Sequence, residues 1–123
     1  MPTEAEWEYM ARAKTQSYFS TGDSPNSLLG YANVPDETFK KNLKDRGRSV
    51  GYSVVLGKDG FAGKAPVGSF KSNDWLLSDM HGNVFEWCFD GYAANAYSSH
   101  APVNPYNRTD NTDLRVIRGG CYM

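Results

Sequence analysis

The sequence predicts an irregular α+β domain that is low in regular secondary structure. One helix is strongly marked near the N-terminus, whereas the candidate strands are few and short. The long segments between them are rich in Gly, Pro, Asn, Asp and Ser, which favour turns. The chain has 123 residues, of which 40% are hydrophobic and 14% aromatic, so it can form a single domain with its own core.

The segment PTEAEWEYMARAK predicts a helix over residues 4–14. Thr3 and Glu6 have the spacing of a capping box, in which each side chain accepts a hydrogen bond from the backbone of the other residue. Apolar residues then recur at i, i+3 and i+4, which predicts one core-facing stripe. The residues of this stripe are Trp7, Met10 and Ala11.

The segment VFEWCF, residues 84–89, predicts a strand. Alternate residues of a strand face opposite sides, so Phe85, Trp87 and Phe89 share one face, and Val84, Glu86 and Cys88 share the other. Both faces are apolar except for one carboxylate, and we expect both to be buried. A buried carboxylate needs a compensating partner, so Glu86 should have one. Further short strands are expected in the Val-rich segment GYSVVL, near Val67 and in LRVIRGG at the C-terminal end.

The charge balance excludes several functional classes. A net charge of −1 gives no global field for nucleic acid or for an anionic membrane, so neither is expected as a partner. The sequence has no apolar run long enough to cross a bilayer and no charged-then-apolar leader, so a soluble, cytoplasmic chain is expected.

Two stretches are rich in the oxygen ligands that calcium prefers. The first pairs YANV with KDGF, and the second is DMHGNVFE. Neither matches the EF-hand pattern, and on composition alone a simple turn is the preferred interpretation of each. The two histidines, His81 and His100, lack zinc-ligand spacing, and His81 is expected to be a structural hydrogen-bonding residue.

Residues 40–48 contain five basic residues around a single acid. A solvated loop or short helix is the preferred interpretation. An anionic partner is the alternative, although no interleaved aromatic residues support it. Of the two cysteines, Cys88 is expected in the core and Cys121 at the surface.

Seven motifs occur in the order seen in one family: PTEAEWEYMARA, STGDS, YAN, DGF, APVGSF, DMHGNVFEWC and RVIRGG. Together they resemble the formylglycine-generating enzyme family, also called sulfatase-modifying factor or FGE-sulfatase domains. The resemblance covers nearly the whole chain. It implies a variant C-type-lectin-like fold stabilised by calcium.

The resemblance also implies which residues bind calcium. The first site falls on the side chains of Asn33 and Asp59 and on the backbone carbonyls of Val34 and Phe61. The second falls on the carboxylates of Asp79 and Glu86 and on the carbonyls of Gly82 and Val84. One or two calcium ions are therefore expected, and a calcium ion becomes the expected partner of Glu86.

The family's domains are about twice as long as this chain, so residues 1–123 are expected to form a partial domain. In catalytic members the copper-binding cysteine pair lies beyond the last motif present here. We therefore expect a non-catalytic module that has no catalytic residues and binds no copper. Uncovered sheet edges and apolar surface would favour a homo-oligomer, most simply a dimer.

Two alternatives remain open. The segment at residues 91–107 could bind a protein or carbohydrate through exposed Tyr92, Tyr97 and Tyr106, although these rings are expected to pack on the core. The other alternative is copper- and oxygen-dependent oxidation of a peptidyl cysteine. It would require Cys88 and Cys121 to replace the missing pair.

Overall fold

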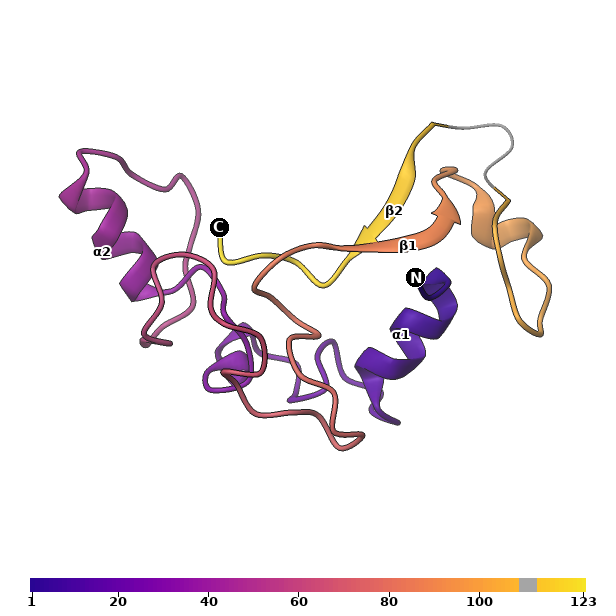
Figure 1. Cartoon of the computed structure of the whole chain (residues 1–123), viewed down its shortest axis with the longest axis horizontal. Coiled ribbons are helices and arrows are strands. Elements are labelled where there is room, and N and C mark those ends of the chain that lie inside the picture. The colour runs from indigo at the N-terminus through magenta and orange to yellow at the C-terminus, as the bar shows by residue number, and fades with distance from the viewer. Residues whose placement is uncertain (109–112) are drawn as a thin grey trace.

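The computed structural model describes residues 1–108 and 113–123 and confirms the irregular α+β class. Figure 1 shows α2 at one end of the molecule and α1 with the β1–β2 ribbon at the other, joined by long loops. In the described part of the chain, no helix is long and apolar enough to cross a membrane. The elements are α1 (Glu4–Arg12), the 3-10 turn η1 (Pro25–Leu28), α2 (Glu37–Asp45), β1 (Glu86–Gly91), the 3-10 turn η2 (Ala96–Ser99) and β2 (Arg115–Arg118).

Helix α1 begins with the predicted capping box. Thr3 Oγ1 accepts a hydrogen bond from the Glu6 backbone N–H (3.2 Å), and Glu6 Oε2 accepts one from the Thr3 N–H (2.8 Å). The helix ends two residues earlier than predicted, because Ala13 (φ 45°) and Lys14 (φ 73°) adopt left-handed conformations that stop it. The predicted core stripe is confirmed, with Trp7 and Ala11 buried.

Strands β1 and β2 form an antiparallel ribbon in which Glu86 pairs with Arg118 and Trp87 with Ile117. The first strand runs over 86–91 instead of the predicted 84–89. The strands predicted in GYSVVL and near Val67 do not form. Val55 makes only an isolated bridge with Asp36, and Val67 lies in an exposed turn.

Helix α1 covers one face of this ribbon. Glu4 donates its backbone N–H to the carboxylate of buried Asp90 (2.8 Å). The Arg118 guanidinium bonds to Glu8 (2.8 Å) and lies over the Trp7 ring, 5.2 Å from its centroid. Polar contacts at the N-terminus and in the middle of α1 therefore hold it against the ribbon.

The core consists of two small clusters of buried hydrophobic residues. One lies between α1 and the ribbon, and the other lies among the loops on either side of α2 in the sequence. The first contains Trp7, Ala11, Met80 and Cys88, and the second contains Leu28, Ala32, Val34 and Val55.

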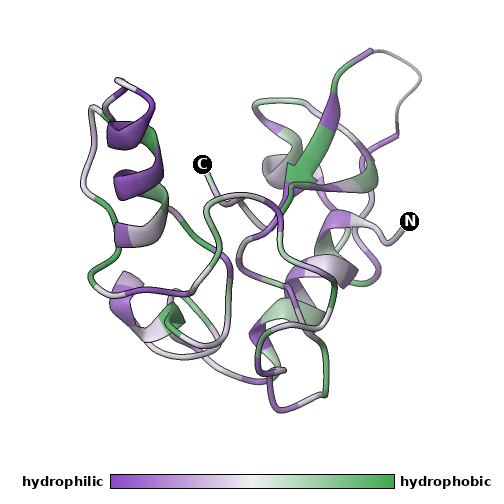
Figure 2. Cartoon of the chain, turned by 60° about the vertical axis from the view of Figure 1, so that its left-hand side comes forward, coloured by the Kyte–Doolittle hydropathy of each residue, from purple (hydrophilic) through white to green (hydrophobic). Residues whose placement is uncertain are grey.

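The prediction that both faces of β1 are buried is wrong. Cys88 is fully buried against α1, but Phe85, Trp87 and Phe89 on the opposite face are 51%, 60% and 48% exposed. The reason is that α1 packs on one side only, and Tyr106, stacked on Phe89 (ring centroids 5.4 Å apart), covers the other only in part. Figure 2 shows hydrophobic residues along the ribbon.

Candidate metal centre

The structure brings together all four residues predicted for the first calcium site. Asn33 and Val34 are consecutive and buried at the end of the loop that precedes α2. The Asp59 carboxylate accepts hydrogen bonds from the backbone N–H of Val34 (3.1 Å) and of Phe61 (2.8 Å). One acidic side chain therefore links two loops that lie 25 residues apart in the sequence.

The Asn33 side chain is fully buried but only half satisfied. Its Nδ2 donates to the Gly63 carbonyl (2.9 Å) and to Asn83 Oδ1 (3.1 Å). Its Oδ1 is buried and has no hydrogen-bond partner in the described part of the chain. A buried polar atom left unpaired costs about 1–3 kcal/mol, so such an atom in a folded protein calls for an explanation. An amide oxygen is also one of the ligands that calcium uses.

A second carboxylate, Asp36, supports this site and was missed by the sequence analysis. It is fully buried; its Oδ1 accepts the Phe39 N–H and caps α2 (2.9 Å), and its Oδ2 accepts the Asp59 N–H. The signal available in the sequence was an aspartate directly before a helical segment, the usual N-cap pattern.

The environment of Asp59 opposes ionisation. Burial raises the pKa of its carboxyl above the usual value, the hydrogen bonds from Phe61 and Val34 lower it, and the nearby charge of Asp36 raises it further. The net result is a raised pKa. Two acidic residues joined by a hydrogen bond, one of them bonded to the residue that follows Asn33, form an environment that favours a cation.

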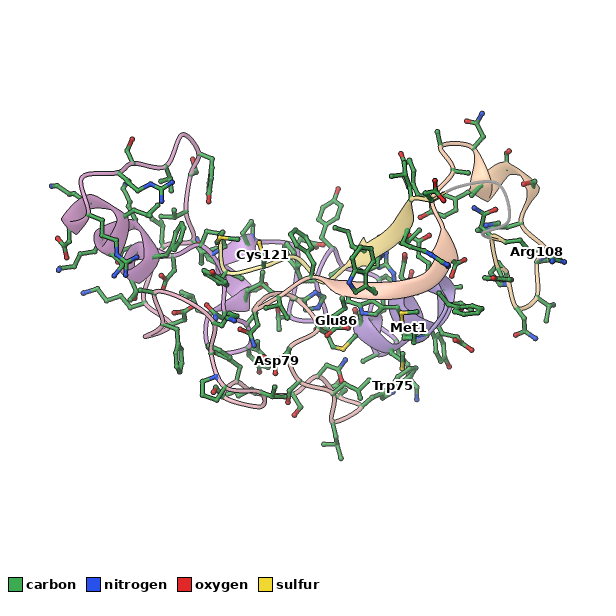
Figure 3. All side chains as sticks on the ribbon, turned by 45° about the horizontal axis from the view of Figure 1, so that its top comes forward. Met1, Trp75, Asp79, Glu86, Arg108 and Cys121 are labelled. Carbon is green, nitrogen blue, oxygen red and sulfur yellow. The ribbon has the colours of Figure 1, made fainter. Side chains whose placement is uncertain are left out.

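The second predicted site is less complete. Asp79 has a left-handed backbone (φ 62°), and its Oδ2 accepts the Gly68 N–H (2.9 Å). Its Oδ1 is buried and has no partner within residues 1–108 and 113–123. Glu86, at the start of β1, accepts a short hydrogen bond from the indole Nε1–H of Trp7 (2.6 Å). Glu86 therefore already has one hydrogen-bond partner within the chain, the Trp7 side chain. Figure 3 labels both carboxylates, which share no hydrogen-bond partner among the described residues.

The other two residues predicted for this site connect it to the first. A Cβ added to buried Gly82 would lie 2.2 Å from the Asn33 carbonyl oxygen, so only glycine allows this approach of the two backbones. Val84 lies two residues further on, and since its half-exposed side chain is a hydrocarbon without ligand atoms, only its carbonyl is a candidate ligand.

Asn83 joins the two sites and was also missed by the sequence analysis. It is buried, has a left-handed backbone (φ 66°) and donates its N–H to the Asn33 carbonyl (2.7 Å). Its side chain accepts from Asn33 Nδ2 (3.1 Å) and makes reciprocal bonds with the Ala65 backbone (2.9 and 3.1 Å). The HGN turn was the available signal, because asparagine tolerates left-handed conformations.

The donor chemistry of both sites consists of carboxylate, amide and carbonyl oxygens. Within residues 1–108 and 113–123, no group of three or more His, Cys, Asp or Glu residues is arranged around a metal position. His81 Nε2 accepts the Ser20 backbone N–H (3.1 Å), and burial lowers the pKa of its imidazole, which favours the neutral form. It thus makes the structural hydrogen bond that was expected.

The two cysteines lie in different environments. Cys88 is fully buried, and burial, followed by the negative charge of Glu4, raises the pKa of its thiol to about 11. Cys121 is partly exposed, and its Sγ donates to the Met123 carbonyl (3.3 Å). Both are free thiols.

Together, the fold and these sites define a small, loop-rich α+β domain with oxygen-lined candidate cation sites. The family model of the sulfatase-modifying factor enzyme 1-like domain (FGE-sulfatase) matches residues 1–123, and the chain belongs to this family.

The relatives include the formylglycine-generating enzyme of Mus musculus, which is 34% identical over 125 residues, covering 100% of this chain and 30% of that protein. The inactive C-alpha-formylglycine-generating enzyme 2 of Bos taurus is 32% identical over 127 residues, covering 100% of this chain and 32% of that protein. The structure of PvdO from Pseudomonas aeruginosa matches with a TM-score of 0.70 and 28% identity, covering 99% of this chain and 40% of that one. The chain therefore spans about a third of the length of these curated relatives.

Proposed function

We propose that this chain is a calcium-stabilised, non-catalytic module of the FGE-sulfatase family, with the family's variant C-type-lectin-like fold, that self-associates. The observation that carries the proposal is that each predicted calcium site contains a buried oxygen, Asn33 Oδ1 or Asp79 Oδ1, with no hydrogen-bond partner among the described residues. One lies in each of the two positions where the family resemblance predicts calcium.

In the first site, Asn33 and Asp59 would supply side-chain oxygens, and Val34 and Phe61 would supply carbonyls. The ion would provide positive charge for the unpaired Asn33 oxygen and for an aspartate whose pKa is raised by burial and by Asp36. Asp36 would position Asp59 by accepting its backbone N–H. This site fits a hard cation well.

In the second site, Asp79 and Glu86 would supply carboxylates, and Gly82 and Val84 would supply carbonyls. The fit is weaker, because the Trp7 indole already occupies one oxygen of Glu86. We therefore propose that calcium binds the first site more tightly than the second.

The experiment is a thermal melt in calcium and in EDTA, combined with isothermal titration of calcium into the metal-free chain. A higher Tm in calcium and saturable binding are expected, because an ion that binds only the folded state stabilises that state. Asn33→Leu removes the unpaired oxygen and should abolish the tighter binding event. An unchanged Tm and no binding heat would contradict the calcium proposal.

The non-catalytic part rests on the cysteines. A fully buried thiol with a pKa of about 11 is protonated at neutral pH, whereas copper binds the thiolate. Relatives named formylglycine-generating enzyme favour a catalytic alternative, whereas one relative of similar identity is named an inactive enzyme. Stoichiometric copper binding that is lost in Cys121→Ser would support the catalytic alternative.

Self-association is supported by the uncovered face of the β1–β2 ribbon, which we call the ribbon face and define by Phe85, Trp87, Phe89 and Ile117. Contiguous exposed apolar residues of this size commonly mark an interaction surface. A two-fold dimer would cover the ribbon face of both copies at once.

The segment at residues 91–107 provides a second candidate, a binding surface for a protein or carbohydrate. The prediction that its tyrosines pack on the core is wrong for Tyr92 and Tyr97, which are exposed. Tyr97 donates its hydroxyl to Glu4 (2.7 Å), whereas Tyr106 stacks on Phe89. Glycan-array binding lost in a Tyr92→Ser, Tyr97→Ser double variant would favour this function.

A further inference from the structure

A cavity of about 410 Å³ lies beside α2, at a distance in the sequence from the candidate calcium ligands of β1. Figures 1 and 2 place the C-terminal end of the chain between α2 and the β1–β2 ribbon, and its last residues form one wall of this cavity. We call it the α2 cavity and define it by Phe39, Asn42, Arg46, Arg48, Ala62 and Tyr122.

The α2 cavity is positively charged. Arg46 and Arg48 line it, and no aspartate or glutamate does. Neither guanidinium has an ion pair or hydrogen bond within residues 1–108 and 113–123. The acid closest to them in the sequence, Asp45, is paired with Lys41 (2.7 Å). Two like charges at one cavity favour an anion between them.

A structural role at the end of α2 does not account for both arginines. Cationic side chains often bond the last carbonyls of a helix. Here backbone groups already do so: the Arg46 N–H bonds to Asn42 and Leu43, the Gly47 N–H to Lys44, and the Arg48 N–H to Leu43. The guanidinium groups are therefore left available for a ligand.

An aromatic wall completes the α2 cavity. Phe39 and Tyr122 meet edge to face, with ring centroids 6.2 Å apart and planes at 79°. Phe39 is buried in α2, and the Tyr122 N–H bonds to the Asn83 carbonyl (3.2 Å), so both rings have fixed anchors. Phe39 directly precedes the basic stretch, whereas Tyr122 is distant from it in the sequence, which is why the sequence alone did not reveal this aromatic pair.

We propose that the α2 cavity binds a small organic anion, a carboxylate or phosphate carried on an aromatic body. Arg46 and Arg48 bind the anionic group, for which the planar guanidinium offers paired donors. Asn42 adds an amide at the wall, and the body of the ligand lies against Phe39 and Tyr122. The volume lies within the range of small-molecule sites, which is roughly 300–1,000 Å³.

The test titrates four probes into the calcium-saturated chain and follows backbone amide shifts by NMR. The probes are phenyl phosphate, phenylacetate, inorganic phosphate and 2-phenylethanol. Saturable shifts of Asn42, Arg46 and Tyr122 with phenyl phosphate or phenylacetate are expected, with the stronger of the two identifying the anionic group. Weaker binding of inorganic phosphate and of 2-phenylethanol is expected, because inorganic phosphate lacks the aromatic body and 2-phenylethanol lacks the anionic group.

The double variant Arg46→Gln, Arg48→Gln should weaken binding by at least about tenfold, as expected for loss of charge-assisted bonds. The double variant Lys40→Gln, Lys44→Gln removes the same charge from α2 itself, at residues that do not line the α2 cavity, and it should bind within about twofold of the parent. Tyr122→Leu tests the aromatic wall without changing charge. The proposal is overturned if no probe gives saturable shifts, if 2-phenylethanol binds as well as the anions, or if both double variants weaken binding equally.

Discussion

The Asn33 side chain donates to the Asn83 side chain across 50 residues of sequence, and the Asn83 N–H returns a bond to the Asn33 carbonyl. This reciprocal pair connects the loop of the first candidate calcium site to the turn of the second. Both residues are buried, so the exchange takes place where unpaired amides are costly. The two sites should therefore respond together when either residue changes.

Asn83→Ala should destabilise the chain by about 3 kcal/mol, because it leaves the Asn33 and Ala65 groups unpaired and forces alanine into a left-handed conformation. Urea unfolding in calcium measures this loss. Asn104→Ala is the matched control, since Asn104 is also left-handed (φ 50°) but exposed. It should cost only about 1 kcal/mol, the backbone part. Equal losses in the two variants would show that the Asn83 hydrogen bonds contribute nothing.

The sequence predicted the locally determined features well. The capping box of Thr3 and Glu6 needs only neighbours along the chain, and it forms as expected. The burial of β1 was predicted wrongly, because a strand's alternation identifies two faces but not what packs on each.

The residues of the candidate metal centre were likewise predicted only in part. The family resemblance assigned Asn33 and Asp59 to one calcium site, and in the structure Asp59 accepts the N–H of Val34, the residue that follows Asn33. Asp36 and Asn83 were missed because their roles arise from hydrogen bonds to residues 23 and 50 positions away. Such contacts have no periodic signature in the sequence.

The two thiols should react at very different rates. With a pKa of about 11 and no exposure, Cys88 should resist a thiol reagent at about pH 8, whereas partly exposed Cys121 should react. Labelling with Ellman's reagent should give one fast thiol in the native chain and none in Cys121→Ser. Both should react in urea. A fast thiol in native Cys121→Ser would mean that Cys88 is accessible and would weaken the non-catalytic proposal.

The raised pKa of Asp59 predicts a pH dependence in the absence of calcium. Because the folded state holds this proton more tightly than the unfolded state, whose carboxyl has the usual value of 3.8, stability falls as pH rises from the unfolded pKa through the raised folded one. The free-energy difference between the parent and Asp59→Asn in EDTA should therefore shift in favour of the variant between about pH 4 and about pH 7.

Calcium should reverse this pH trend in the stability difference between the parent and Asp59→Asn. It competes with the proton for Asp59, so the parent should gain stability over Asp59→Asn as pH rises in saturating calcium. Urea unfolding of both chains at each pH, with and without calcium, measures the two trends. Parallel trends in EDTA and in calcium would place the ion away from Asp59.

The ribbon face should determine self-association. Trp87 and Ile117 are cross-strand partners, so the double variant Trp87→Thr, Ile117→Thr removes adjacent apolar groups while keeping residues that suit a strand. Sedimentation equilibrium should show a concentration-dependent dimer in the parent. The dissociation constant of this dimer should rise at least about tenfold in the double variant, because residues at the centre of an interface contribute most of its binding energy. Leu56→Thr is the control, since Leu56 is exposed to a similar extent as Trp87 and lies outside the ribbon. A parent that stays monomeric at all concentrations, or a Leu56→Thr chain that dissociates equally, would rule out the ribbon face as the contact.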